Sequence, residues 1–295
     1  MAEIGLGTVQ FGMNYGISNK GGRIFNLDAS KLLQVAIENH IEVLDTASAY
    51  GTSESFLGKI LPEPHRFKVV TKITPLNLAR IEKKDIEKAE EVFKNSLKKL
   101  GQKQVYGLLM HNADDLLADG GFDLFRKLQQ FKSKGLVKKI GVSVYHTDQV
   151  EKILNHYKID LIQLPINVMN QSFLAEGYLS ELKSHNVEIH VRSVFLQGLL
   201  LMPLKEISNF FAPILPVLKR YHGFLKDNAL TPVQGALSFI QQIPELDVVV
   251  LGVNNAAQLL SNIKDHAVVQ KLNIDFSPFA VVDEKMINPS SWENR

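Results

Sequence analysis

The 295-residue chain has no cysteine and only one tryptophan, and it lacks any long apolar run. Without cysteine the protein has neither disulfide bonds nor thiolate-bound zinc, and the nine histidines show no His-Glu-x-x-His or comparable ligand spacing. We therefore expect no metal site. No run approaches the roughly 18 to 20 apolar residues that cross a bilayer, and the amino terminus lacks a basic signal-peptide opening. These features predict a cytoplasmic protein that does not bind membranes.

A large charge of either sign is also missing. The formal net charge is +2, and the 33 basic residues are interleaved with 31 acidic ones instead of forming a stripe. This balance argues against a nucleic-acid partner. The apolar share of 45% and the charged share of 22% are typical of a globular protein with a sizeable core.

Eight short apolar runs recur along the chain and predict strands, at Ile4–Val9, Ile41–Leu44, Phe67–Thr71, Val105–Met110, Lys139–Val142, Ile159–Leu164, Val187–Val191 and Asp247–Leu251. Between most of them lie helical patterns, at Asp28–Ala36, Asp85–Leu100, Phe122–Lys134, Thr147–His156, Glu176–His185, Thr231–Gln242 and Ala256–Ile263. This alternation predicts a (β/α)₈ TIM barrel, a single domain over residues 1–295. The long gap between the seventh and eighth strands predicts an extra helical insertion, around residues 208–226.

The rival architecture is a doubly wound dinucleotide fold. Its fingerprint requires Gly-x-Gly-x-x-Gly between the first strand and the first helix. Here Gly5-Leu6-Gly7-Thr8-Val9-Gln10 places Gln10 where the third glycine should be, so the fingerprint fails.

Three apolar runs each lead into an ionisable residue, namely Asp45, Lys72 and His111. In a barrel the carboxyl ends of the strands face the active mouth, so these side chains should converge. Tyr50 follows Asp45 by five residues. A tyrosine has a pKa of about 10; a nearby ammonium would lower it, and a carboxylate would hold that ammonium charged and in place. His111 could orient a substrate oxygen by a hydrogen bond.

Each of these residues has a simpler explanation when taken alone. Asp45 could cap a turn, Lys72 could face solvent at a strand end, and His111 could be a satisfied core histidine. Their joint placement at successive strand ends, together with the tyrosine, favours a catalytic site.

Several motifs together resemble the aldo-keto reductase family: Gly5-Leu6-Gly7-Thr8, Asp45-Thr46-Ala47-x-x-Tyr50-Gly51-x-Ser53-Glu54-x-x-Leu57-Gly58, Thr71-Lys72 and Leu109-Met110-His111. The resemblance implies a barrel that uses a reduced nicotinamide coenzyme to turn an aldehyde or ketone into an alcohol. It also implies that Tyr50 is the general acid, Lys72 its activator, Asp45 the partner of Lys72, and His111 the orienting group.

The resemblance further implies where the coenzyme lies. Ser143 and Gln163 match the pair that binds the nicotinamide amide, and Ser193 and Gly198 match the diphosphate loop. Loops after the seventh and eighth barrel strands often bind phosphate. The complete set of implied coenzyme-binding residues is Gly7, Thr8, Asp45, Ser143, Gln163, Arg192, Ser193, Gly198, Gly252, Asn254, Gln258 and Asn262.

The chain departs from the family pattern at Val144, where an asparagine usually follows the serine, and at two other places. Arg192 stands where an aromatic residue usually stacks on the nicotinamide, so it either stacks by its planar face or binds an acidic substrate. Asn254 and Gln258 stand where a cation often holds the 2′-phosphate, and both are neutral. On the family's habit we expect NADP(H), with NAD(H) as the alternative.

Two other functions remain open. One is a non-catalytic, coenzyme-sensing regulatory subunit built on the same barrel. The other is an isomerase or lyase in which Lys72 forms an imine with a carbonyl substrate. The expected partner is a small-molecule carbonyl compound, sugar-like or acidic, and the sequence leaves its identity and the oligomeric state open. Its pocket should be lined by the loops Phe11–Tyr15, Asn112–Gly121 and Tyr145-His146, and by Phe195.

Overall fold

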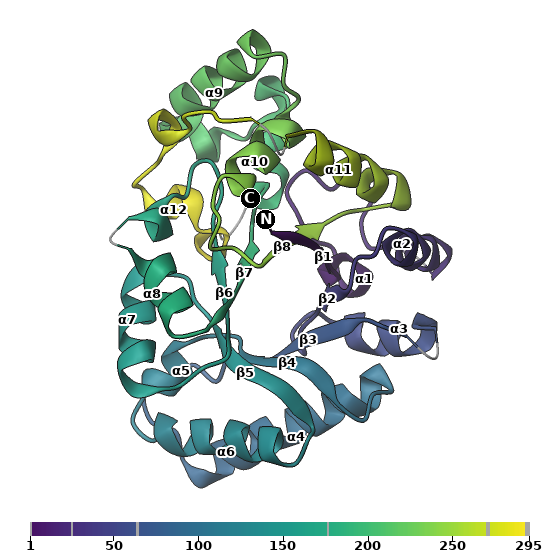
Figure 1. The fold of residues 1–295 in the computed structure, drawn as a ribbon, viewed down its shortest axis with the longest axis vertical. Helices are drawn as coiled ribbons and strands as arrows, with labels where there is room; N and C mark the ends of the chain where they lie inside the picture. The colour runs from purple at the N-terminus through teal and green to yellow at the C-terminus, as the bar shows by residue number, and fades with distance from the viewer. Residues whose placement is uncertain (1, 25, 63–64, 176, 270–271, 293–295) are drawn as a thin grey trace.

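The structure is a computed structural model that describes residues 2–24, 26–62, 65–175, 177–269 and 272–292. Within these residues eight parallel strands close into a barrel, and β1 pairs with β8 to complete it. The strands are β1 (Glu3–Gly7), β2 (Val43–Asp45), β3 (Lys68–Ile73), β4 (Val105–Met110), β5 (Val137–Ser143), β6 (Leu161–Pro165), β7 (Glu188–Arg192) and β8 (Val248–Gly252). Figure 1 shows the strands as a central ring with the helices outside it. The predicted (β/α)₈ barrel is confirmed.

The helices surround this ring and follow the strands in order. The α-helices are α1 (Val9–Gly12), α2 (Asn26–Glu38), α3 (Ser53–Ile60), α4 (Lys83–Leu100), α5 (Asp114–Leu117), α6 (Gly121–Ser133), α7 (Thr147–His156), α8 (Tyr178–Ser184), α9 (Leu215–Asp227), α10 (Pro232–Gln241), α11 (Ala256–Val268) and α12 (Glu284–Ile287). The short 3₁₀ helices are η1 (Ser172–Leu174), η2 (Leu196–Leu201), η3 (Leu204–Glu206), η4 (Asn209–Ile214), η6 (Ser277–Phe279) and η7 (Pro289–Ser291). No described helix is both long and apolar enough to cross a membrane.

Helix α4 begins earlier than its apolar pattern indicated because Glu82 caps it. The Glu82 side chain accepts a hydrogen bond from the backbone N–H of Asp85, and the Asp85 carboxylate accepts one from the backbone N–H of Glu82 at 2.9 Å. This reciprocal capping box satisfies two backbone N–H groups that a helix start otherwise leaves unpaired. The helix ends as expected at Gly101, whose φ of 67° is the left-handed conformation of a C-terminal cap.

Several other boundaries also differ from the sequence-based ones, among them the end of β1 and the start of α8. The chain leaves β1 at Gly7, two residues before the predicted end, because Thr8 is the N-cap of the single-turn helix α1, which begins at Val9. Phe11 is thereby buried in the core and is not among the residues that line the cavity at the active mouth, contrary to the prediction. Of the helix predicted over Glu176–His185, Glu176 lies outside the described residues and α8 begins at Tyr178.

Helix α3 was missing from the predicted helices, because it is short and contains a glycine near its end. That glycine, Gly58, lies directly against the carboxyl end of α4. A Cβ at this position would lie 2.1 Å from the carbonyl oxygen of Lys99, so only glycine permits this close packing. The contact holds α3, and with it the loop that carries Tyr50, against the rest of the barrel.

The apolar core has two layers, as expected for a barrel covered by helices. A small cluster fills the barrel interior and consists of Val43, Val70, Leu109, Leu161, Val248 and Val250. A much larger cluster lies between the strands and the surrounding helices. The interior is therefore packed, and ligands can reach only the loops at the barrel ends.

The predicted insertion between β7 and β8 is confirmed, since η2, η3, η4 and α9 all lie in this segment. Figure 1 shows α9 outside the ring, and α9 contacts α10. The carboxyl-terminal segment packs on the insertion through aromatic rings. Trp292 contacts Phe211 of η4 edge-on at a centroid distance of 4.8 Å, and Phe276 contacts Phe224 of α9 at 5.9 Å.

Candidate active site

The carboxyl ends of β2, β3 and β4 bring three ionisable side chains together, as the strand pattern predicted. Asp45 is the last residue of β2, Lys72 is the next-to-last residue of β3, and His111 directly follows β4. The strands pair in parallel, so these residues lie at the same end of the barrel. The side chains of Asp45 and Lys72 are 6% and 0% exposed. Their charges therefore interact in a site that is shielded from water.

Lys72 is held by a dense set of hydrogen bonds. Its Nζ donates to both carboxylate oxygens of Asp45, at 2.7 and 2.8 Å, and to the carbonyl oxygen of Thr46 at 2.9 Å. Gln163 Nε2 donates to Asp45 Oδ1 at 2.7 Å and so fixes the carboxylate from the opposite side of the barrel. Burial lowers the pKa of Lys72, and the charge and hydrogen bonds of Asp45 counteract that shift.

Two successive turns carry Tyr50 back over this ion pair. The N–H of Tyr50 donates to the carbonyl of Ala47 at 3.0 Å, and the N–H of Ser53 donates to the carbonyl of Tyr50 at 3.0 Å. Lys72 Nζ lies 3.4 Å from the Tyr50 hydroxyl and 4.9 Å from the ring centroid. The spacing of Asp45 and Tyr50 in the sequence therefore places the phenol beside the buried ammonium.

The pKa of Tyr50 is raised above its ordinary value of 10.0, contrary to the sequence-based expectation. Burial of the phenol is the largest cause, and the negative charge of Asp45 adds to it, whereas Arg192 acts in the opposite direction. The shift therefore has the opposite sign to the expected one, because burial and the Asp45 carboxylate outweigh the effect of nearby positive charge. Tyr50 is therefore a neutral phenol at physiological pH.

The His111 ring lies edge-on to the Tyr50 ring, with a centroid distance of 5.7 Å and an interplanar angle of 80°. Burial lowers the pKa of His111 to about 3, and the positive charges of Lys72 and Arg192 contribute to the shift. The imidazole is therefore neutral at physiological pH. Its Nδ1 is buried without a hydrogen-bond partner among the described residues, so a proton there would be unsatisfied. We therefore assign the N–H to Nε2.

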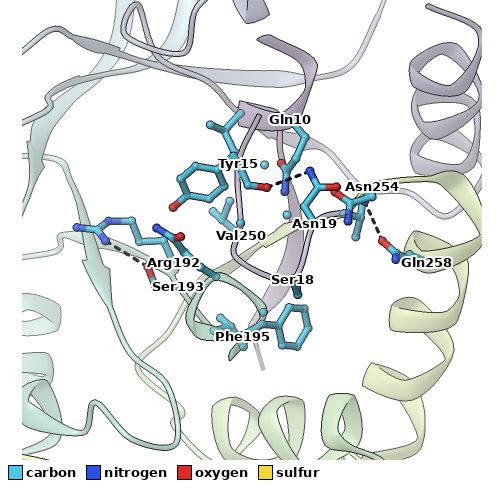
Figure 2. Close-up of a pocket in the computed structure, with 18 of the residues that line it drawn as sticks. Gln10, Tyr15, Ser18, Asn19, Arg192, Ser193, Phe195, Val250, Asn254 and Gln258 are labelled. Atoms are coloured by element: carbon cyan, nitrogen blue, oxygen red, sulfur yellow. Dashed lines mark hydrogen bonds between the residues drawn. The ribbon is translucent and has the colours of Figure 1, made fainter. Parts of the chain in front are cut away.

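A cavity of about 250 Å³ runs from Asp45 and Tyr50 toward the amino end of α11 (Figure 2). Most of the predicted coenzyme residues line it: Gly7, Thr8, Asp45, Arg192, Ser193, Gly198, Gly252, Asn254, Gln258 and Asn262. At its far end Asn255 caps α11 by accepting a hydrogen bond from the N–H of Gln258 at 2.9 Å. The Gln258 side chain in turn accepts one from the backbone of Asn254 at 2.8 Å, as drawn in Figure 2.

Ser143 and Gln163 are not among the residues that line this cavity, but both are fully buried at the ends of β5 and β6. Ser143 Oγ and Gln163 Oε1 have no hydrogen-bond partner in the described part of the chain. Buried polar atoms are rarely left unpaired in folded proteins. One hydroxyl donor and one amide acceptor are therefore available at the neighbouring ends of β5 and β6.

Of the loop at residues 13–22, sequence reasoning assigned residues 13–15 to the active mouth and missed residues 16–22 as part of the site. The backbone of this loop joins the loop after β7 where the N–H of Ile17 donates to the carbonyl of Gln197 at 3.1 Å, and Lys20 pairs with Glu206 at 2.7 Å. Tyr15, Ser18 and Asn19 from this loop line the cavity, as Figure 2 shows. Tyr15 was predicted only as a residue at the active mouth. The glycine-rich stretch at residues 16–22 was the available signal for a loop that approaches other backbone closely.

Gln10 is a second residue that the sequence reasoning did not assign to the site. It is buried beside Gly252 at the cavity wall, and its Oε1 has no partner within the described residues. An amide in the otherwise apolar turn of α1 was the signal that could have identified it.

Solved structures with a similar fold include aldo-keto reductases. An aldo-keto reductase from Bacillus halodurans, in its holo form, superimposes with a TM-score of 0.72 at 18% identity, covering 99% of this chain and 94% of that chain. A glycerol dehydrogenase from Gluconobacter oxydans gives a TM-score of 0.69 at 18% identity, covering 93% and 88%. At such identities the likeness shows the fold.

The sequence itself decides the family. No curated protein gives a significant sequence match. The family model of the aldo/keto reductases, however, matches residues 3–278, which is nearly the whole chain. The chain therefore belongs to the aldo/keto reductase family of oxidoreductases.

Proposed function

We propose that the protein reduces an aldehyde or ketone to an alcohol with a reduced nicotinamide coenzyme, and that Tyr50 donates the proton. The observation that supports this most directly is the position of the neutral Tyr50 phenol, 3.4 Å from the buried Lys72 ammonium, which Asp45 holds by two hydrogen bonds. A phenol that gives up its proton becomes an anion, and a positive charge nearby is needed to stabilise that anion. Lys72 supplies that charge.

Each residue near the substrate carbonyl has a separate role in the proposed reaction. The coenzyme, when bound, supplies a hydride to the carbonyl carbon. The substrate oxygen becomes an alkoxide, whose basicity approaches that of hydroxide, and a phenol with a raised pKa still protonates so strong a base. Lys72 then stabilises the Tyr50 phenolate, and the neutral His111 donates its Nε2–H to the substrate oxygen and orients it.

The buried polar groups match a nicotinamide. A carboxamide needs one donor for its oxygen and one acceptor for its NH₂ group. The Ser143 hydroxyl is a free donor, and Gln163 Oε1 is a free acceptor because the Nε2 of Gln163 already donates to Asp45. We therefore assign Ser143 and Gln163 to the carboxamide, and the cavity residues Ser193, Gly198, Gly252 and Asn254 to the phosphate and adenosine portions.

The far end of the cavity is uncharged, which bears on the choice of coenzyme. Asn254, Gln258 and Asn262 line it, and no cation does so among the described residues near them. A charge-assisted hydrogen bond contributes roughly 1.5 to 3 kcal/mol, or about tenfold or more in affinity. We therefore propose that NADPH is preferred over NADH by less than about tenfold. Fluorescence titration with both reduced coenzymes measures this ratio, and a larger preference in either direction contradicts the assignment.

The central test is Tyr50→Phe, which removes the hydroxyl and keeps the ring. We expect kcat to fall by roughly 10² to 10⁴, the range for loss of a general acid. Coenzyme affinity should stay within a few-fold because the phenol hydroxyl contributes no bond to the assigned coenzyme groups. The matched control is Tyr157→Phe, since the Tyr157 hydroxyl bonds only the carbonyl of Leu116, outside the site.

Two outcomes would contradict the proposed function. Unchanged turnover in Tyr50→Phe would exclude the phenol as the acid. A wild-type protein that binds coenzyme tightly, yet reduces no aldehyde or ketone in a broad panel, would instead indicate a coenzyme-sensing role.

A further inference from the structure

Arg192 is a cation held in place by uncharged groups at the end of β7. Its guanidinium carbon lies 4.4 Å from the centroid of the Tyr145 ring. Nη2 donates to the carbonyl oxygen of Val144 at 3.0 Å, and Nη1 donates to Ser193 Oγ at 3.3 Å. A guanidinium has five N–H groups, so stacking and two hydrogen bonds orient the group and leave donors for a ligand.

The charge of Arg192 has no counter-ion among the described residues, because none of their ion pairs includes it. Asp45, the one acidic residue that lines the cavity, is engaged by Lys72. His111 is uncharged, as shown above, and Tyr50 is a neutral phenol. The centre where the carbonyl reacts therefore carries one uncompensated positive charge, and it lies in a partly buried position where solvent screens it poorly.

Two anions could balance this charge, namely a coenzyme phosphate and a substrate carboxylate. Figure 2 shows Arg192 on the side of the cavity opposite to Asn254 and Gln258, with its guanidinium directed away from them. The guanidinium donates a hydrogen bond to Val144 and stacks on Tyr145, and both contacts place it at the end of β5. Its positive charge also acts on the Tyr50 phenol. The guanidinium therefore belongs to the reacting end of the cavity.

We propose that Arg192 binds a carboxylate of the substrate, so that the enzyme acts on carbonyl compounds that also carry a carboxylate group. This inference rests on the proposed function, because it names the substrate class of that same site. A guanidinium binds a carboxylate through two parallel N–H···O bonds, which fixes the orientation of the substrate as well as its affinity. Arg192 is then a specificity-determining residue.

The test compares short oxo acids with aldehydes of the same chain length that end in a methyl group, for example succinic semialdehyde with butanal. For the wild type we expect kcat/KM to favour the acid by at least about tenfold, since the bonds concerned are charge-assisted. Arg192→Gln should reduce this ratio by about tenfold to a hundredfold, mainly through KM. The dissociation constant of the reduced coenzyme should stay within about threefold of the wild-type value.

Arg126→Gln is the matched control. Arg126 also lies over an aromatic ring, at 5.6 Å from the centroid of Phe122, but it is exposed on α6 and paired with Asp123. The Arg126→Gln substitution removes the same charge without changing the cavity. The ratio of kcat/KM for the acid to that for the aldehyde should therefore stay at the wild-type value. The inference is overturned by a wild type without preference for the acid, by an Arg192→Gln variant that keeps the preference, or by a loss confined to coenzyme affinity.

Calorimetric titration with succinate separates this inference from the proposed function. If no carbonyl compound is reduced, the reductase proposal fails, but the coenzyme-loaded protein can still be titrated. Succinate binding that is at least tenfold weaker in Arg192→Gln than in the wild type would support a carboxylate site at Arg192. Absence of succinate binding by the wild type, or equal binding by both proteins, would overturn it.

Discussion

At the scale of single residues, the site depends on a buried pair of opposite charges. Lys72 and Asp45 are almost inaccessible to solvent, so removing one partner leaves the other charged group buried without compensation. Breaking such a pair is strongly destabilising, by roughly 3 to 5 kcal/mol. The same two residues that set up the proposed chemistry therefore also influence the folding free energy.

Lys72→Met should therefore reduce the free energy of unfolding by about 3 to 5 kcal/mol, as measured by urea denaturation. The double variant Asp45→Asn/Lys72→Met should recover part of this loss because no charge is left unpaired. Lys68→Met is the matched control on the same strand. Lys68 pairs with Glu42 at 2.7 Å, but both side chains are about half exposed, so the change should stay below about 1 kcal/mol. Equal losses in Lys72→Met and Lys68→Met would contradict this account.

At the scale of secondary-structure elements, the loop after β1 and the loop after β7 meet over the cavity. The β7 loop holds three consecutive residues in the left-handed region, Leu196, Gln197 and Gly198, with φ of 47°, 53° and 94°. A Cβ on Gly198 would lie 1.8 Å from Ser18 Oγ. The glycine therefore permits both the backbone conformation and the close approach of the two loops.

Gly198→Ala should displace the β1 loop and weaken coenzyme binding by about tenfold or more, which stopped-flow fluorescence would show as faster dissociation. Gly177→Ala is the matched control. Gly177 also has a positive φ, of 75°, but a Cβ there would meet nothing within 4 Å. It should lose about 1 kcal/mol of stability from the backbone conformation and leave coenzyme affinity unchanged. If Gly198→Ala binds coenzyme as the wild type does, the contact of the two loops does not retain the coenzyme.

A partly buried polar network joins β4, β5 and β7 at the end of the barrel opposite the site. Glu188 accepts hydrogen bonds from the Tyr106 hydroxyl and the His190 ring, both at 2.6 Å, and it also pairs with Lys139. Burial alone would raise the pKa of Glu188, but the bonds from His190, Lys139 and Tyr106 outweigh it and hold this pKa well below its usual range.

Because the folded-state pKa of Glu188 is depressed, its contribution to stability is present above the unfolded-state pKa of about 4.3 and is lost as the pH falls below it. Glu188→Gln should therefore be less stable than the wild type at pH 7, and the difference should shrink as the pH falls from about 5 toward 3. Urea denaturation across this range measures it. Glu151→Gln, which changes an exposed residue of α7, should show no such convergence. A constant difference for Glu188→Gln would exclude the linkage.

At the scale of the whole molecule, the insertion and the carboxyl-terminal segment form a second aromatic cluster outside the barrel. Phe276 contacts rings from α9, α10 and η6, through Phe224, Phe239 and Phe279. The single tryptophan, Trp292, is buried against Phe211 and reports on this cluster. Fluorescence thus follows the cluster, while far-ultraviolet circular dichroism follows the barrel as a whole.

If residues 1–295 form a single domain, both signals should change in one cooperative transition. Phe276→Ala should shift both to lower urea concentration and reduce the stability by about 3 to 5 kcal/mol, because it empties a packed site. Val282→Ala, at a position that is 93% exposed in the same segment, should change neither. An earlier transition of the fluorescence alone would show that the insertion and the carboxyl-terminal segment unfold separately from the barrel.

The sequence alone determined the order of the strands and most helices, the closure into a barrel and the four residues at its mouth. Apolar periodicity and the spacing of Asp45 and Tyr50 are local properties, and parallel strands place their ends together whatever the details of packing. Helix α3 was missed because its pattern is short and a glycine interrupts it. Its position depends on contact with α4, which a local pattern does not record.

Only the tertiary structure decided how the groups at the mouth interact. Gln163 contacts Asp45, which lies 118 positions away in the sequence. Arg192, at the end of β7, stacks on Tyr145, which follows β5. The pKa of Tyr50 rose where the sequence suggested a fall, since burial and the Asp45 carboxylate outweigh the effect of nearby positive charge. Electrostatic energies depend on distance and solvent exposure, and the folded chain sets both by bringing distant residues into contact.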